Sequence, residues 1–174
     1  MKRIFIFLLF CFSLTNYSQN LSLEELISLR KNDIANVEEY LSLKGWTFLS
    51  SEEGDNESLS GVAFAYKKEE YSDDAESFFH YYRSDSTDVR RINLQIFNTS
   101  KYNSYLTRIK SFGCKLIDSG VFDGEIKKTY QGATTTFMIT IKNRKDEDSE
   151  STETIYHIAI IDNSDYFLSF SESE

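Results

Sequence analysis

Two helical patterns that each stop at a glycine, with strand-like runs after each, constrain the fold of this chain most. Apolar residues recur at helical spacing over 23–41 and again over about 101–112. Gly45 and Gly113 follow these segments, and a glycine there can adopt the left-handed conformation that closes a helix. The glycines therefore mark two helix-to-strand junctions that lie 68 residues apart.

The first helical pattern opens on a capping-box signature. Ser22 can accept a hydrogen bond from the first turn, and Glu25 can reach back to the backbone of Ser22. Asn32 and Asp33 either divide this pattern into two helices, or one long helix passes through them.

Eight runs of strand-forming residues follow the two glycines. They are 46–50, 60–68, 76–84 and 89–97, then 114–120, 124–132, 134–143 and 154–162. Several alternate apolar and polar residues, which indicates a sheet with one buried and one wetter face. The chain has no proline, and the acidic, serine-rich segments between the runs are typical of hairpin loops.

The sequence thus predicts an α+β domain with an antiparallel sheet, built from two tandem helix-plus-four-strand units (about 22–98 and 99–170). The helices would pack on one face of the sheet. The pattern leaves open whether the two halves form one continuous sheet. A generic α+β arrangement, in which both glycines end helices by coincidence, is the alternative.

Residues 1–19 have the layout of a signal peptide. Lys2 and Arg3 precede an apolar stretch over 4–14, which is too short to span a bilayer, and polar residues follow. Cleavage is expected near Ser18 or Gln19, which would leave 20–174 as a single periplasmic or secreted domain. A lipoprotein signal at Cys11 is a weaker alternative, because Phe10 stands where a small residue is expected.

Removal of the signal peptide would leave Cys114 as the sole cysteine, so the domain must fold without an internal disulfide. Hydrophobic residues make up 40% of the chain and aromatic residues 15%, which suffices for a packed core. The net charge of −9 repels phosphate backbones and anionic lipids, so we expect no nucleic acid as a partner and no membrane insertion after the leader is removed.

Several segments of the mature chain carry a resemblance to other proteins. They are LEELISLRKND, KGWTF, AESFFHYYRS, RRINLQ, YNSYLTRIKSFGCKLI and KTYQGATTTF. They resemble a group of leader-bearing secreted or periplasmic proteins of Bacteroidetes-type bacteria with no assigned activity. That resemblance implies export and a compact α+β domain. The element order also resembles the β-lactamase inhibitor protein, as a fold analogy that implies no function.

The motifs of common enzyme classes do not occur in this sequence. It has no G-x-S-x-G elbow, no P-loop and no paired-cysteine or H-x-x-x-H zinc spacing. His80 and His157 lie in strand-like runs, where a structural role is the usual one, although both would meet if they faced the same side of the sheet. We therefore predict no catalytic residues, no metal site and no cofactor. Calcium bound by the acidic runs 52–58 and 146–153 is a minor alternative.

A sheet face that carries aromatic and polar side chains is the strongest candidate for a binding surface. Tyr81 and Tyr82 are adjacent and must point to opposite faces, so one of them should cover the outer face. The predicted binding residues are Tyr81, Tyr82, Arg91, Asn93, Gln95, Thr136 and Thr140. Cross-strand pairing that stabilises the sheet without a ligand is the alternative interpretation.

Two functions fit these features. The first is a non-catalytic cell-envelope protein that binds an envelope or extracellular protein, or a small ligand, on its sheet face. The second is a small exported hydrolase that uses paired carboxylates, which would need two acids in a cleft and one of them shielded from water.

Overall fold

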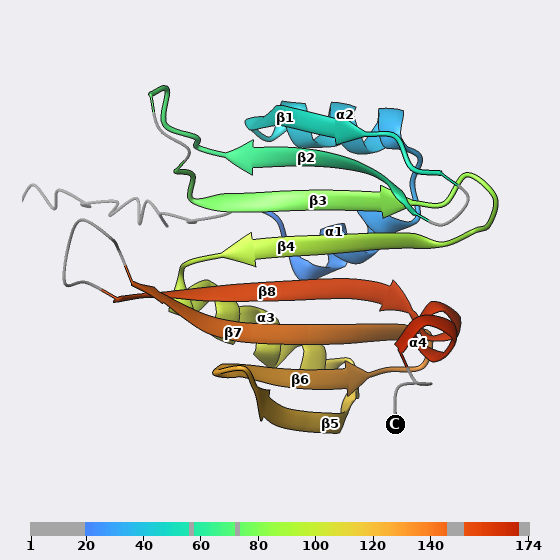
Figure 1. Ribbon diagram of the computed structural model, residues 1–174, viewed down its shortest axis with the longest axis vertical. Coiled ribbons are helices and arrows are strands. Elements are labelled where there is room, and N and C mark those ends of the chain that lie inside the picture. The colour runs from blue at the N-terminus through green and yellow to red at the C-terminus, as the bar shows by residue number, and fades with distance from the viewer. Residues whose placement is uncertain (1–19, 56–57, 72–73, 146–151, 171–174) are drawn as a thin grey trace, which may run out of the picture.

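A single antiparallel sheet of eight strands, with helices on both faces, forms the domain (Figure 1). The computed structural model describes residues 20–55, 58–71, 74–145 and 152–170. The first half contains α1 (Leu23–Arg30), α2 (Ile34–Leu43), β1 (Trp46–Glu52), β2 (Ser60–Tyr66), β3 (Ser77–Arg83) and β4 (Arg90–Ile96). The second half contains α3 (Thr99–Ser111), β5 (Lys115–Phe122), β6 (Glu125–Gln131), β7 (Thr135–Lys145), β8 (Thr152–Asp162) and α4 (Asn163–Phe170).

The expectation of two tandem four-stranded sheet units is not supported. The strand order is β1-β2-β3-β4-β8-β7-β6-β5, so the last strands of the two halves pair with each other. Ile92 lies opposite Ile160 and Ile96 opposite Tyr156 along this junction. The α+β class and the antiparallel sheet are confirmed. One continuous sheet leaves β1 and β5 as its edges, and the register shifts once in each edge pairing.

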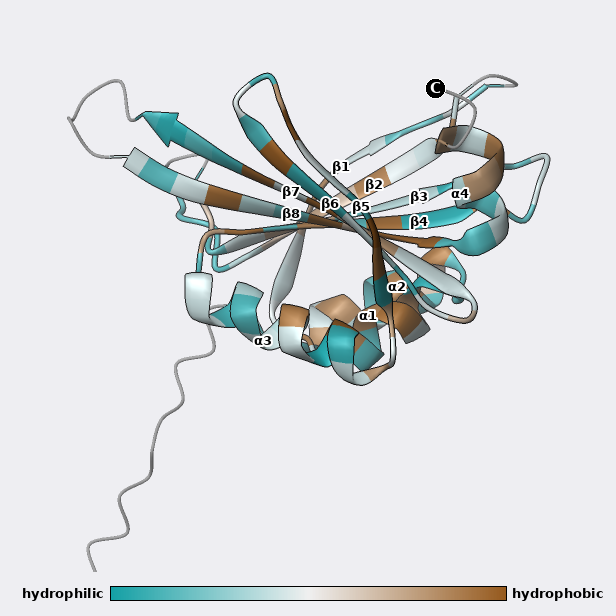
Figure 2. Cartoon of the chain, turned by 90° about the horizontal axis from the view of Figure 1, so that it is seen from below, coloured by the Kyte–Doolittle hydropathy of each residue, from teal (hydrophilic) through white to brown (hydrophobic). Residues whose placement is uncertain are grey.

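Helices α1, α2 and α3 cover one face of the twisted sheet (Figure 2). The main core lies between them and the apolar side chains of that face, and it includes Leu26, Phe79, Leu94, Ile109 and Ile158, all fully buried. Helix α4 lies on the opposite side of the sheet, where it contacts β7 and β8. We call this opposite side the open face.

Local signals explain where the helices begin and end. The capping box at Ser22 and Glu25 is present, as predicted. Asp33 caps α2 by accepting a hydrogen bond from the Asn36 N–H, so the first helical pattern consists of two helices. Gly45 and Gly113 have φ angles of +81° and +77°, the left-handed region in which a side chain would be strained.

None of the helices in the described part of the chain has the length and apolar character needed to cross a bilayer. The predicted signal peptide lies outside the described residues. Asn20, the first residue described, is held in place: its side chain donates to the carbonyl of Lys44 and accepts from the indole N–H of Trp46. Cleavage near Ser18 or Gln19 would leave this contact intact.

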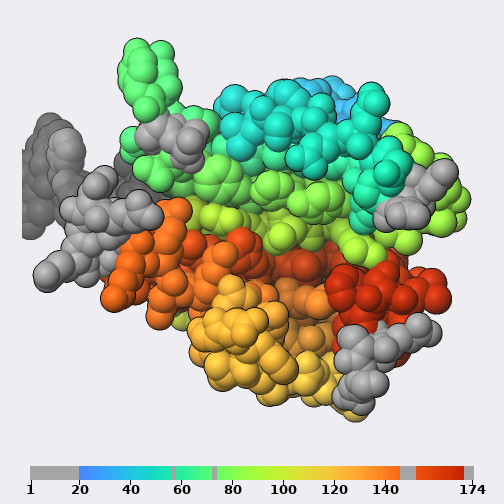
Figure 3. Space-filling model, viewed as in Figure 1, coloured from blue at the N-terminus to red at the C-terminus, as the bar shows by residue number. Residues whose placement is uncertain are grey.

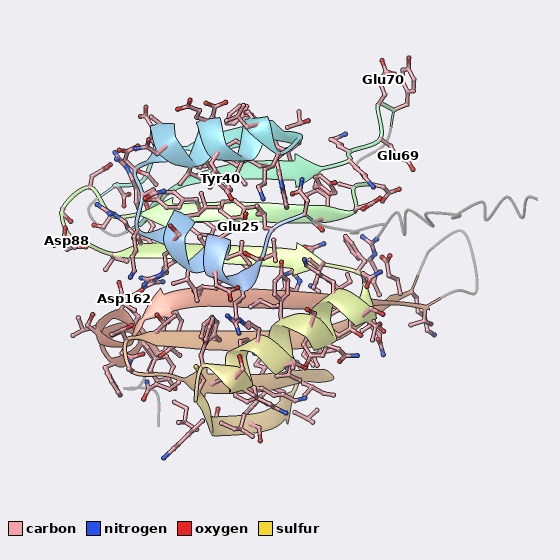
Figure 4. The ribbon with its side chains drawn as sticks, turned by 180° about the vertical axis from the view of Figure 1, so that it is seen from behind. Glu25, Tyr40, Glu69, Glu70, Asp88 and Asp162 are labelled. Carbon is pink, nitrogen blue, oxygen red and sulfur yellow. The ribbon has the colours of Figure 1, made fainter. Side chains whose placement is uncertain are left out.

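Glu25 links α1 to α2 on the helix-covered face (Figure 4). Its Oε1 accepts hydrogen bonds from the Lys44 ammonium at 2.5 Å and from the Tyr40 hydroxyl, and its Oε2 accepts one from the Ser22 N–H at 2.6 Å. Partial burial raises the pKa of Glu25, but the hydrogen bonds from Lys44, Ser22 and Tyr40 outweigh it and lower the pKa from 4.5 to about 2.

Glu25→Gln should lower the free energy of unfolding at pH 7 by roughly 1 kcal/mol, because the ion pair with Lys44 is lost while glutamine can still complete the capping box. The contribution of a carboxylate with a depressed pKa is present above pH 4.5 and is lost as the pH falls towards 2. Urea unfolding at pH 7 and pH 3 should therefore show a larger difference between wild type and variant at pH 7. Glu39→Gln, at an exposed position on α2, is the control. Equal effects of both substitutions at pH 7 would contradict this assignment.

Candidate ligand-binding groove

The open face of the sheet carries rows of side chains set by strand register. Tyr82 lies opposite Arg91, and His80 lies opposite Asn93 across β3 and β4. The β4–β8 pairing continues these rows, with Asn93 opposite Ala159. Further along the rows, β8 pairs with β7, so that Ala159 meets Met138, His157 meets Thr140 and Ile161 meets Thr136.

A groove of about 420 Å³ opens on this face. Its floor comes from β4, β7 and β8, and its lining residues are Leu59, Tyr82, Arg91, Ile92, Asn93, Met138, Thr140, His157, Ala159, Ile161 and Phe170. Figure 3 views this face, with β8 in the hollow between the two halves and the red α4 at one side. Volumes of this size are at the small end of the range for ligand sites.

Helix α4 forms one wall of the groove and is held by Arg91. The guanidinium donates two hydrogen bonds of 2.7 Å to the carboxylate of Asp165, which is buried, and a third of 2.8 Å to the hydroxyl of Ser169. It also lies over the ring of Phe170, 5.1 Å from the centroid. A bidentate pair of this kind neutralises the charge of Arg91 inside the groove.

The start of α4 is fixed by Asn163. Its side chain accepts a hydrogen bond of 2.8 Å from Thr136 and donates to the carbonyls of Gly132 and Ala133 in the β6–β7 turn. Ile161 and Thr136 are fully buried although they belong to the open face. The helix thus converts one end of the open face into a closed wall.

The structure brings four of the seven predicted binding residues together at the groove: Tyr82, Arg91, Asn93 and Thr140. Gln95 lies on the same face outside the groove, and Thr136 is buried beside Asn163. The prediction that Tyr81 belongs to the binding surface was wrong. Its side chain points into the core on the helix-covered face, is 1% exposed, and donates its hydroxyl hydrogen bond to the carbonyl of Asn32. Arg91 is also not a free cation, since Asp165 binds it.

Two polar atoms in the groove lining are buried without a hydrogen-bond partner. They are Oδ1 of Asn93 on β4 and Nε2 of His157 on β8. His157 lies directly opposite Gln95, so Asn93 and His157 are diagonal neighbours on the same face. An unsatisfied buried polar atom costs about 1–3 kcal/mol.

Both histidines face the open side, as one reading of the sequence allowed. Burial lowers the pKa of His157, and the nearby Lys142 lowers it further, while Glu125 acts in the opposite direction and the charge of His80 adds a smaller lowering. Burial likewise lowers the pKa of His80, against the effect of Glu52. The ring of His157 is therefore neutral at pH 7, with one nitrogen that donates and one that accepts.

Other chemistries find less support in the described residues. No group of three or more His, Cys, Asp or Glu side chains among them is placed to hold a metal ion. The two acidic runs considered for calcium lie partly outside the described residues. Cys114 is half-buried, and burial raises the pKa of its thiol, which disfavours the reactive thiolate.

Carboxylates gather instead at another pocket, of about 450 Å³, near the β2–β3 loop. Glu69, Asp74, Glu76 and Glu153 line it. Lys67 lines it too and donates to Glu76 at 2.9 Å, so this acidic cluster contains its own cation. Figure 4 shows Glu69 in that loop, well away from Glu25 and Asp162.

Sequence reasoning missed α4, and with it Phe170 in the groove lining and Asp165, the partner of Arg91. The α4 segment, NSDYFLSF, has only eight residues and does not continue an earlier helical pattern. The asparagine and aspartate at its start are helix-capping residue types, and they were the available signal. His157 was recognised as a strand residue, but its unpaired nitrogen depends on neighbours from three strands.

Comparisons with protein-family models, with curated proteins and with solved structures found no match for this chain.

Asp165→Ala should release α4 from the sheet, because the Arg91 guanidinium loses its partner in a mostly buried position. We expect a loss of about 2–4 kcal/mol in the free energy of unfolding. Amide hydrogen exchange over 163–170 should accelerate. Glu153→Ala breaks an exposed pair with Arg144 and should cost less than about 1 kcal/mol. Unchanged exchange in α4 in the Asp165 variant would show that other contacts hold the helix.

Proposed function

We propose that this protein is an exported, non-catalytic binding protein of the cell envelope, which holds its ligand in the open-face groove. The observation that carries the proposal is the groove itself, whose mostly apolar lining includes the polar side chains of Asn93, Thr140 and His157. A mostly apolar lining with a few polar groups is typical of ligand sites.

Export is supported by the signal-peptide pattern of residues 1–19 and by the resemblance to leader-bearing proteins of Bacteroidetes-type bacteria. The proposed location is the periplasm or the outside of the cell. The net charge of −9 favours a partner other than nucleic acid or an anionic membrane. The ligand can also be a side chain of an envelope protein that inserts into the groove.

The groove supports binding better than hydrolysis by paired carboxylates. The described residues that line it include no aspartate or glutamate. Helix α4, which forms one wall, carries the carboxylate of Asp165. Arg91 donates to both of its oxygens, and Ser169 donates to Oδ1. The acidic pocket near the β2–β3 loop has the carboxylates but also Lys67 among them.

Ala159→Leu should abolish binding without unfolding the domain, because a larger apolar side chain would fill the groove floor from an only partly buried position. The test is a screen of small molecules and envelope extracts against residues 20–174, read by ligand-observed NMR and pull-down. Lys127→Leu makes an apolar substitution on the same face, outside the groove, and is the matched control. Ligands that bind both variants equally would place the site elsewhere.

Export is tested by expressing the full chain in a Gram-negative host of the Bacteroidetes type. Osmotic shock or the culture medium should release a processed protein, and its N-terminal sequence should begin at or before Asn20. A chain that keeps residues 1–19 and remains with the membrane fraction would contradict export as a processed, soluble species. A start after Leu21 would contradict the proposed cleavage region.

A further inference from the structure

The edge strand β5 is exposed along nearly its whole length, although four of its eight side chains are large and apolar (Figure 1). Seven of the eight residues are exposed. Leu116, Ile117, Val121 and Phe122 each expose between 46% and 71% of their surface. On β6, Ile126 lies opposite Val121 and is itself 42% exposed. A long, apolar, uncovered edge strand is a site at which a further strand can pair.

The backbone of β5 offers hydrogen-bonding groups to such a strand. Asp123 and Gly124 form a two-residue turn to β6 with φ angles of +52° and +77°, the signature of a type I′ hairpin. The residues that flank this kind of turn form a hydrogen-bonded pair, and the pairs then alternate along the two strands. The N–H and C=O groups of Val121 and Ser119 therefore point to the free side of β5. The register shift in this pairing lies before Asp118 and does not affect them.

The charge of the β5–β6 hairpin permits a second copy of the chain to approach it. Residues 115–131 contain three lysines and three acidic residues and so have no net charge, although the whole chain carries −9. Two copies can therefore meet here without the repulsion between the more acidic parts of their surfaces. The other edge strand, β1, lies beside α2 and ends at Glu52, with Glu53 next to it, so two copies would bring like charges together there.

An antiparallel pairing about Ser119 matches side chains as well as charges. In a symmetric pair with Ser119 on the two-fold axis, residues at equal distances from the axis lie opposite each other. A parallel pairing would instead set Lys115 against its own copy. The opposed pairs about Ser119 are Val121 with Ile117, Phe122 with Leu116, and Lys115 with Asp123.

We propose that β5 is a self-association surface, at which β5 of a second copy pairs antiparallel with Ser119 on the two-fold axis. The sheet then continues from one copy into the other, and the apolar side chains of both β5 strands become buried. One pair of edge strands buries less surface than a stable dimer does, so the dimer depends on protein concentration. This inference is independent of the groove, whose floor lies on β4, β7 and β8.

The first test is analytical ultracentrifugation of residues 20–174 over a concentration series. The dimer fraction should rise with concentration. Ser119→Lys places two ammonium groups opposite each other on the axis and should raise the dissociation constant by about tenfold or more. Ser50→Lys makes the same change at an exposed position of the other edge strand and should leave the dissociation constant as in the wild type. Thermal melts of both variants check that the domain still folds.

The second test is disulfide cross-linking, which reports the register. Directly opposite residues of an antiparallel pair lie within the Cα separation that a disulfide can span. In a Cys114→Ser background, Ser119→Cys should therefore form a covalent dimer under mild oxidation faster than Ser50→Cys does. The serine-to-cysteine change replaces one atom, so this test holds even where lysine at position 119 disturbs folding.

Each outcome bears on the proposal. A protein that stays monomeric throughout the series overturns self-association, and so does a dimer whose dissociation constant Ser119→Lys leaves unchanged. Cross-linking of Ser119→Cys no faster than that of Ser50→Cys overturns the register about Ser119. A monomeric Ser119→Cys variant that cross-links to a foreign protein in envelope extracts assigns the edge to a different partner. The groove is tested separately, by Ala159→Leu.

Discussion

The antiparallel pairing of β4 with β8 is the interaction on which the rest of the structure depends. Each half of the chain ends its strands at this junction, and five residue pairs join them into one sheet. The core-facing residues of both strands then form a single core with α1 and α3. The Arg30–Asp162 ion pair, at 2.5 Å, ties α1 of the first half to the end of β8 in the second. The junction also sets Asn93 beside Ala159 and so creates the groove floor.

Helix α4 determines the chemistry of the groove that this junction creates. An isolated Arg91 on the open face would make the surface cationic and would favour anions. Asp165 removes that charge and places Phe170 over the guanidinium, so the same arginine becomes part of a wall. The face that remains is mostly apolar around two unsatisfied polar atoms. One short helix thus changes the charge and the shape of the sheet face.

The elements could be predicted from the sequence because their signals are local. The capping box, the two helix-ending glycines and the eight strand runs can each be recognised within a short window of sequence. The sequence left open whether the first helical pattern breaks at Asp33. The pairing of β4 with β8 joins residues that are 60 to 68 positions apart, so no local period indicates it. Tyr81 was misplaced because both faces of β3 carry aromatic residues, with Phe79 and Tyr81 inward and Phe78 and Tyr82 outward. Arg91 was taken for a ligand contact because its partner lies in a helix that the pattern did not show.

The stability of the fold does not by itself explain Asn93 and His157. Both side chains could be replaced by apolar residues of similar size on a face that already carries Ala159, Met138 and Ile161, and such replacements are often neutral or stabilising. The β-sheet hydrogen bonds come from the backbone and need neither side chain. Each side chain instead buries one polar atom without a hydrogen-bond partner, which costs stability relative to such replacements. Both side chains line a groove whose walls are mostly apolar, and this is why the groove, rather than the acidic pocket or Cys114, is the site on which the proposed function rests.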